Sequence, residues 1–447
     1  MMELNLRTEF SLAKYLVPIF LILGVSDIDY YVGYPIFDEQ YLILILLTAL
    51  GYANKRIEIP LVLIGIVLFF AYPYLAEYSN YEKTLVAVIS IPLCILVVTS
   101  CFSSSGKAFG IILLGFLLYP LTVDRNYLDI ISHIVIDNTA MLGMSMSIMC
   151  GIVFLFVLAG QILLQSGMVD KLIDYITKHV ESPGKVAILS SAVFGSVSGS
   201  AVANVMSTGQ VTIPLMIKCG YSKTKAAAYE AVASTGGQLM PPVMGAAAFL
   251  MAEIIMVSYW DVALAALIPA LVFYSVLFIS VPKTNKQINK KTRDFKKTIS
   301  VSPLTEAMYG LIILSAAIGL IIGVMDQTGL SFHITSILNV ASGGNIFILL
   351  IMIALLCIIL GMGMPTSSTY LLVAIVAAPT LIDAGITEIW AHMFVLYYGV
   401  LSMLTPPVAL SSFSAAEIAG ANPILTALTS MRLAWPLYIM PFIFVWL

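Results

Sequence analysis

The chain has 447 residues, of which 60% are hydrophobic and 10% are charged, and its formal net charge is −3. Soluble domains carry roughly 25% charged residues, so this composition predicts an integral membrane protein and excludes an ordinary soluble domain. The net negative charge argues against nucleic acid as a partner. The five cysteines are scattered and form no CxxC pair, so we expect small hydrophobic side chains rather than disulfides or metal ligands. They are Cys94, Cys101, Cys150, Cys219 and Cys357.

Six apolar runs that could form helical spans occupy the first third of the chain. No signal-peptide cleavage pattern is recognisable, so the first run is expected to remain as a helix. The runs lie at 12–28, 40–53, 57–75, 84–101, 108–123 and 144–167. Lys and Arg favour the cytoplasmic side of a membrane, and a cytoplasmic N-terminus makes the basic and acidic loops alternate consistently along these runs.

A polar but uncharged stretch follows, at residues 186–217, with three lysines before it and three after it. Because basic residues mark the cytoplasmic side, both ends are expected to be cytoplasmic, and the stretch is predicted to be a re-entrant hairpin. Its tip is expected near 198–200, where Gly195 and Gly199 permit a tight reversal. A single span with a small-residue helix interface is the alternative.

The next crossing, at 226–257, contains a predicted helix break. Residues 234–242 hold two glycines and two adjacent prolines, which end an α-helix. A return span at 262–281 leads to residues 282–303, which carry seven of the chain's 21 basic residues. This basic loop is predicted to be cytoplasmic and to fix the topology, with anionic membrane lipid as an alternative partner.

The pattern then recurs with a constant offset of 165 residues. Three pairs share this offset: Pro214 and Pro379, Gly220 and Gly385, and Pro241 and Pro406. The first copy, 144–281, starts outside the membrane, and the second copy, 304–447, starts inside. The second copy has its own uncharged stretch at 345–382, which carboxylates follow. We therefore predict an inverted-topology repeat with two re-entrant helical hairpins and broken helices, which places a substrate site near the membrane midplane in secondary transporters.

The polar residues of the two hairpins suit an anion and a small cation. Free N–H groups at half-helix N-termini favour a carboxylate, and unwound carbonyls and hydroxyls are hard oxygen ligands. Neither hairpin contains Asp, Glu or Lys between its flanks. Because a proton relay normally needs an intramembrane carboxylate or histidine, sodium coupling is favoured over proton coupling. Glu230, Glu253 and Glu417 are the candidates for an exception.

Three stretches carry a resemblance to a known family. They are GSVSGSAVANVMSTGQVTIPLM from Gly195, EAVASTGGQLMPPVMGAAAFLMAE from Glu230, and GMGMPTSSTY from Gly361 with its later LTPPVALSSFSAAEIAGANP. They resemble the fused permease of tripartite ATP-independent periplasmic (TRAP) transporters, most closely the branch served by TAXI-type substrate-binding proteins. The likeness is strong from about Ile148 to Trp435. Residues 1–130, a group of N-terminal membrane helices, correspond by position to the fused small-subunit helices.

The resemblance implies an elevator-type, sodium-driven importer in the bacterial inner membrane. Its substrate would be a small organic anion, a carboxylate or amino acid, delivered by a periplasmic TAXI-type binding protein. Carried over residue by residue, the Na⁺ candidates are Ser198, Ser200, Gly236, Gly361, Thr366 and Thr405. The substrate candidates are Asn204 and Gln238, with Ser200, Thr366 and Ser367 beside them. Many fused relatives continue through further hydrophobic segments, so a chain ending at Leu447 is expected to be a compact variant or a shortened product.

Two other classes of protein stay open from the sequence. An intramembrane serine protease would use GMSM, at 143–146, with His333 or His392 as base. Against it, GSVSG lacks the G-x-S-x-G spacing, and a doubled site has no role in proteolysis. A passive channel is the other class, and a fixed stoichiometry between sodium and substrate flux would distinguish a carrier from it. The residues favour a transporter that is not an enzyme.

Overall fold

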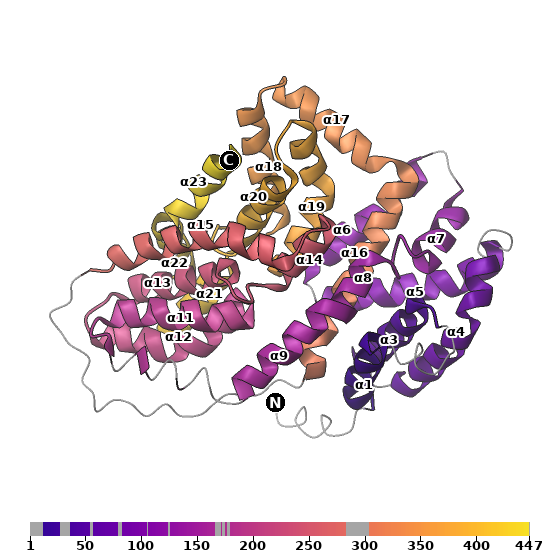
Figure 1. Ribbon diagram of the computed structural model, residues 1–447, viewed down its shortest axis with the longest axis horizontal. Coiled ribbons are helices and arrows are strands. Elements are labelled where there is room, and N and C mark those ends of the chain that lie inside the picture. The colour runs from indigo at the N-terminus through magenta and orange to yellow at the C-terminus, as the bar shows by residue number, and fades with distance from the viewer. Residues whose placement is uncertain are drawn as a thin grey trace. The chain divides into compact units, whose positions relative to one another are not determined.

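In the computed structural model all regular secondary structure among the described residues is helical (Figure 1). These are residues 12–26, 36–53, 57–78, 83–104, 106–123, 126–165, 171, 175–176, 179–282 and 304–446. Apart from Pro282, the predicted basic loop lies outside the described residues. The chain forms two compact units: the first contains residues 1–158 and 302–332, and the second contains residues 159–301 and 333–447. Each unit is described by itself below.

In the first unit, helices lie over the predicted apolar runs. The helices are α1 (Ala13–Val25), α3 (Asp38–Ala53), α4 (Glu58–Tyr78), α5 (Lys83–Ser104), α6 (Lys107–Leu118) with the 3₁₀ turn η1 (Tyr119–Thr122), α7 (Tyr127–Ile136), α8 (Met144–Ile148), the π-helical η2 (Met149–Val153) and α16 (Leu304–Thr328). Helix α9 (Phe154–Gln165) begins here and ends in the second unit. Helix α16 packs against α3, α5, α6, α7 and α8, so it forms the centre of this unit.

Two glycines of α16 let a neighbouring turn approach the helix closely. Gly319 faces the backbone of Ala140 and Met141, and Gly323 faces the side chain of Ala140. A side chain at either glycine would collide with that turn. The close approach of small residues is typical of helix packing in membranes.

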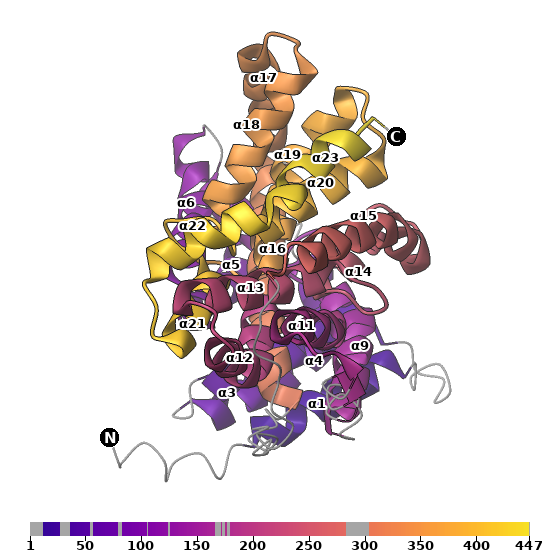
Figure 2. The same ribbon diagram turned by 90° about the vertical axis from the view of Figure 1, so that its left-hand side faces the viewer.

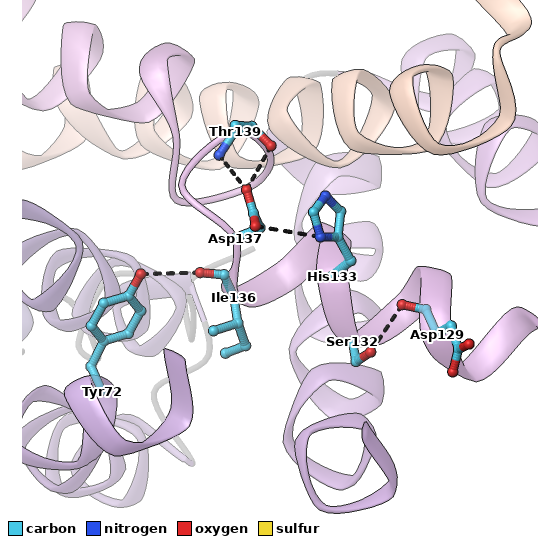
Figure 3. Close-up of polar contacts among 7 residues, drawn as sticks. All are labelled: Tyr72, Asp129, Ser132, His133, Ile136, Asp137 and Thr139. Carbon is cyan, nitrogen blue, oxygen red and sulfur yellow. Dashed lines mark hydrogen bonds and ion pairs between the residues drawn. The ribbon is translucent and has the colours of Figure 1, made fainter. Parts of the chain in front are cut away.

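The same turn, after α7, is fixed by hydrogen bonds (Figure 3). Asp137 Oδ1 accepts hydrogen bonds from the backbone N of Thr139 at 2.8 Å and from its hydroxyl at 2.6 Å. The other oxygen, Oδ2, lies 3.4 Å from His133 Nδ1. From α4, the Tyr72 hydroxyl donates to the Ile136 carbonyl at 3.1 Å. The end of α7 is therefore tied both to the turn and to α4.

The second unit contains two helical hairpins. The first hairpin is α11 (Pro183–Ser198) followed by α12 (Ala201–Lys218), and the second hairpin is α18 (Ile346–Leu360) followed by α19 (Thr366–Asp383). The first reverses at Gly199, whose φ of 63° is the left-handed conformation that glycine adopts readily. Gly195 was also expected at the reversal, and this is wrong. It lies inside α11, where its missing side chain lets Gly237 approach.

Each hairpin is followed by a broken helix, and the helix bounds repeat. Helices α12 and α19 begin and end 165 residues apart, as do α13 (Lys223–Gly236) and α20 (Glu388–Leu401). After α13 come the 3₁₀ turn η3 (Gly237–Leu239) and α14 (Ala246–Ile254), and after α20 comes α21 (Leu410–Ala419). Helix α21 packs against α12 and α13, whereas α14 packs against α19 and α20. The two copies are thus interlocked, because each broken helix ends against the hairpin of the other copy.

The remaining helices of the second unit are α15 (Tyr259–Ile279), α22 (Pro423–Leu433) and α23 (Trp435–Phe444), and α17 (Leu330–Ser342) begins at the boundary between the units. Both views show α11, α12, α13 and α21 as one bundle of helices, with α18, α19 and α20 grouped separately (Figures 1 and 2). This arrangement places the helix breaks between the two groups.

Among the described helices, five are long and apolar enough to cross a membrane. They are α15, α19 and the larger parts of α4, α5 and α16. Helices α22 and α23, bent by 43° relative to each other, would make a sixth span. The prediction of an all-helical, multi-span membrane protein is therefore confirmed. By length and composition α19 could cross alone, although the sequence predicts it as one arm of a re-entrant hairpin. Re-entrance, opposite membrane orientation and elevator movement stay predictions.

Candidate functional site

A small cavity in the second unit lies where the first hairpin tip, the first helix break and the start of α19 meet. The space open to a water-sized sphere inside it is about 10 Å³, roughly one water molecule and far below the roughly 300–1,000 Å³ of typical small-molecule pockets. The cavity is lined by Gly199, Gln238, Gly245, Ala247, Thr366, Ser367, Leu396 and Val400. In this conformation it has room for about one water molecule or one small ion.

Gln238 connects the two hairpins across this cavity. Its Nε2 donates a hydrogen bond to the Gly199 carbonyl at 2.9 Å, and its Oε1 accepts one from the Thr366 hydroxyl at 3.0 Å. Both Gln238 and Thr366 are buried. Gly245 lies beside this contact, and a Cβ there would stand 3.0 Å from the Gly199 carbonyl oxygen. The amide side chain therefore bonds to the tip of the first hairpin and to the start of α19 in the second. Residue 245 has to be small because the Gly199 carbonyl lies next to it.

Several predicted site residues gather here. Gln238, Thr366 and Ser367 line the cavity, and Ser198 and Ser200 flank Gly199 at the tip. The Ser200 side chain accepts a hydrogen bond from the backbone N of Ala203 at 3.3 Å and so caps α12. The Ser198 hydroxyl is buried and has no hydrogen-bond partner in the described part of the chain. Nine other buried hydroxyls of the described chain share this state, and what distinguishes Ser198 is its position next to Gly199 at the hairpin tip. A water or an ion would satisfy its hydroxyl.

The two predicted glycine ligands lie at helix ends rather than on the cavity wall. Gly236 ends α13, and its bare Cα faces the ring of Phe273 on α15. Gly361 follows α18 and faces the side chains of Ser402 and Thr369. A Cβ at either position would collide with these neighbours, so close packing is enough to explain both glycines. Any contribution to a cation site would come from their carbonyl oxygens.

Thr405 and Asn204 are engaged elsewhere in the unit. The Thr405 hydroxyl lies 2.8 Å from the Leu401 carbonyl and 2.7 Å from the Tyr438 hydroxyl. Asn204 is fully buried, and its Nδ2 donates to the Ser191 carbonyl at 2.7 Å and to the Ser234 carbonyl at 3.4 Å. The structure does not place either residue in the cavity, because both use their polar atoms to join helices.

Sequence reasoning missed part of the wall. Leu396 and Val400 are one helical turn apart on α20 and form its apolar side, and Gly245 and Ala247 lie in the small-residue run after the double proline. The four-residue spacing of Leu396 and Val400 places both on one face of α20. The sequence alone does not show that this face lies toward the cavity. No group of three or more His, Cys, Asp or Glu suited to a metal ion occurs among the described residues. A cation at this site would depend on carbonyl and hydroxyl oxygens.

The protease reading finds no support at His392. This buried side chain lies on α20, and its Nδ1 is 2.9 Å from the hydroxyl of Tyr370 on α19. The geometry pairs the histidine with a phenol rather than with a serine, so it lacks the nucleophile–base contact that a serine hydrolase needs.

The fold and the cavity together define an all-helical, multi-span membrane protein with a small cavity where a hairpin tip, a helix break and the start of the second hairpin's α19 meet. This class contains membrane transporters. The chain matches the family model of the tripartite ATP-independent periplasmic transporter, DctM component, over residues 93–315 and 287–447. It belongs to this family, the large permease component of TRAP transporters, and is not an enzyme. The prediction of a TRAP transporter permease from the three sequence stretches is confirmed, whereas the fusion and the TAXI-associated branch stay predictions.

Similarity to individual relatives covers shorter stretches. A putative TRAP transporter large permease protein from Haemophilus influenzae is 29% identical over 130 residues, covering 28% of this chain and 32% of the relative. A second such protein from the same species is 30% identical over 141 residues, covering 31% and 33%. The C4-dicarboxylate TRAP transporter large permease protein DctM of Rhodobacter capsulatus is 32% identical over 91 residues, covering 20% and 21%. The chain thus matches no more than about a third of the length of these relatives.

Proposed function

We propose that this chain is the permease of a binding-protein-dependent secondary importer of the bacterial inner membrane, which carries a small organic anion together with sodium. Family membership supports the permease role. The name of the Rhodobacter relative, a C4-dicarboxylate transporter, favours a carboxylate as substrate. The resemblance of the hairpin sequences favours a TAXI-type binding protein as partner. It also favours residues 1–130 as fused small-subunit helices.

The observation that carries the site is the Gln238 bridge between Gly199 and Thr366. Thr366 begins α19, and the first N–H groups of a helix have no partner within the helix. A substrate carboxylate would accept hydrogen bonds from these groups and from the Thr366 and Ser367 hydroxyls, and the helix dipole would favour its charge. Gln238, which accepts the Thr366 hydrogen bond, would then lie in contact with the bound anion. We assign Asn204 to holding the first hairpin together rather than to substrate contact.

For sodium, we propose a site at the tip of the first hairpin. Its ligands would include the unpartnered hydroxyl of Ser198 and backbone oxygens next to it, with Ser200 alongside. In the second copy, the loop from Gly361 to Thr366 and the break at Thr405 would supply the equivalent oxygens. In the elevator-type movement that the resemblance implies, the second unit, which holds the cavity, would carry both ions across the membrane.

Thiol labelling tests this proposal at the site itself. Ser367→Cys places a thiol on the cavity wall, and Ser207→Cys places one on the exposed side of α12. Sodium chloride, compared with choline chloride, should slow alkylation of the first thiol, and a C4-dicarboxylate added with sodium should slow it further. The second thiol should react equally under all conditions. Equal alkylation of both thiols, whatever the ions present, would overturn the assignment of the cavity.

A further inference from the structure

A carboxyl group without a cationic partner lies inside the bundle of α11, α12 and α13. Glu230, on α13, is fully buried. Four hydroxyls surround its two oxygens: Ser191 at 2.8 Å, Thr208 at 2.5 Å and Ser234 at 3.3 Å from Oε1, and Thr212 at 2.5 Å from Oε2. These hydroxyls come from all three helices. The cluster does not overlap the cavity described above, so the proposed transport site leaves it unexplained.

The helices packed around Glu230 supply no charge to balance it. The hydroxyl of Tyr274 on α15 is engaged with the backbone, because it donates to the Ala233 carbonyl at 2.7 Å. The charged residues on the surrounding helices α11, α12, α13, α15, α20, α21 and α22 are Lys185, Lys218, Lys223, Lys225, Asp261, Glu388, Glu417 and Arg432. None of them forms an ion pair with Glu230 in the described chain, and the histidine on α20 is bonded to Tyr370.

The hydrogen-bond geometry is one proton short for an ionised Glu230. The Thr208 hydroxyl has a single proton, but three acceptor oxygens face it: Glu230 Oε1 at 2.5 Å, the Asn204 carbonyl at 2.9 Å and Asn204 Oδ1 at 3.1 Å. The Ser191 hydroxyl lies 3.0 Å from it and can donate or accept. The Asn204 amide cannot be turned over, because its Nδ2 already donates to the carbonyls of Ser191 and Ser234. If Thr208 donates to an ionised Glu230, two oxygen lone pairs face each other at Asn204, whose Oδ1 has no other described partner.

A protonated Glu230 removes this conflict. Its O–H donates to the Thr208 hydroxyl, which is then free to donate its own proton to an Asn204 oxygen, Oδ1 or the backbone carbonyl. Neutralisation also avoids the large cost of an unpaired charge in a buried site. A metal ion is a poorer occupant, because the surrounding oxygens already lie in direct contact with the carboxyl group. Ca²⁺, for example, needs oxygens at roughly 2.3–2.6 Å on all sides. Oxygens that already touch one another leave no space for such an ion between them.

We propose that Glu230 is a proton-binding site, and that its bound proton holds the first hairpin on α13. The connections run from the carboxyl group to both arms of the hairpin through Ser191 and Thr208. Two turns beyond Glu230, α13 leads to Gln238, which contacts the hairpin tip. Loss of the proton leaves a buried carboxylate without a cationic partner and the amide oxygen of Asn204 without a donor. Both effects weaken the contact between the first hairpin and α13. The proposal does not depend on which ion drives transport.

Infrared difference spectroscopy on the purified full chain tests the protonation state directly. At neutral pH, wild type minus Glu230→Gln should show the carbonyl band of a carboxylic acid, and this band should shift in D₂O. Glu417→Gln is the matched control, because Glu417 is exposed on α21 and should contribute only a carboxylate band. A carboxylate band lost in Glu230→Gln would overturn the proposal. If Glu230→Gln does not fold, Thr208→Val replaces it as the test. This substitution removes the hydroxyl that accepts the Glu230 proton, so the carboxylic acid band should remain but shift in frequency relative to wild type. A carboxylic acid band that is absent or unshifted in Thr208→Val would overturn the proposal.

Hydrogen exchange tests whether the proton holds the hairpin. After correction for intrinsic rates, amides of α11 and α12 around Ser191 and Thr208 should exchange roughly tenfold faster at alkaline pH than at neutral pH in wild type, as for one lost hydrogen bond. In Glu230→Gln, which cannot ionise, this acceleration should disappear. The same acceleration in both proteins would show that the proton on Glu230 does not hold the hairpin.

Discussion

Removing the hydroxyl of Ser198 should separate sodium binding from folding. In the described structure this buried hydroxyl makes no hydrogen bond, so Ser198→Ala removes no internal contact. The matched control is Ser196→Ala, two residues earlier on α11, where the hydroxyl donates to the Val193 carbonyl at 2.9 Å. Both substitutions delete one oxygen atom from the same helix. Only the first deletes an atom for which the protein offers no partner.

The two substitutions should act on different quantities: Ser198→Ala on sodium affinity and Ser196→Ala on stability. A buried polar group left unsatisfied costs roughly 1–3 kcal/mol, so deleting it should leave the unfolding free energy of the sodium-free protein unchanged or raise it. If sodium is the missing partner of Ser198, the same substitution should weaken sodium binding by roughly ten- to a hundred-fold, at 1.4 kcal/mol per decade. Ser196→Ala should lower the unfolding free energy by about 1 kcal/mol and leave sodium affinity as it is.

Two measurements on the purified proteins are sufficient. Thermal unfolding with and without sodium gives stability and the stabilisation by the ion, which follows from binding to the folded state alone. Uptake against sodium concentration, at matched membrane expression, gives the half-saturating concentration. Thr366→Ala is expected to raise that concentration similarly. If Ser198→Ala lowers stability and leaves sodium dependence unchanged, the hydroxyl has a packing role and the reasoning is refuted.

Three further results are expected. Gln238→Leu leaves the Gly199 carbonyl and the Thr366 hydroxyl without their partner, so KM for substrate should rise roughly tenfold or more, whereas Gln210→Leu, on the exposed side of α12, should not change it. Gly199→Ala should lower the melting temperature more than Gly385→Ala, since both have positive φ but a Cβ meets close neighbours only at Gly199. Single cysteines at the two ends of the first hairpin should both label from the cytoplasm, and those at the ends of the second hairpin from outside; opposite-side labelling within a pair would remove the re-entrant topology.

The sequence predicted well those features that depend on local backbone chemistry. The reversal at Gly199 and the break after Gly236 both follow from glycine and proline. A shared site for the two hairpins was expected because inverted repeats place their broken helices around one site, whereas the Gln238–Thr366 contact joins the break of one copy to the hairpin of the other. The interlocked packing of α14 and α21 could not, because a constant offset reports similarity between copies and says nothing of which copy a helix packs against.

The polar cluster of the first hairpin shows the limit of this reasoning. Ser198, Asn204 and Thr208 all lie in one uncharged stretch, and their residue types do not distinguish their roles. The structure separates them by direction: Ser198 lies at the tip, whereas Asn204 and Thr208 bond within the bundle near Glu230. Those bonds join residues up to 30 positions apart, so they depend on tertiary packing that no local pattern encodes. Glu230 was recognised only as a possible exception to sodium coupling for the same reason.

The central claim, a sodium-driven permease that depends on a binding protein, is tested most directly by uptake into proteoliposomes. The purified chain would be reconstituted with an inward sodium gradient, and radiolabelled C4-dicarboxylates and amino acids would be presented with and without a TAXI-type periplasmic binding protein. We expect accumulation only when sodium and the binding protein are both present, and its loss when the gradient is collapsed. Equal uptake without the binding protein, or equilibration without accumulation, would contradict the account and indicate an ordinary carrier or a channel.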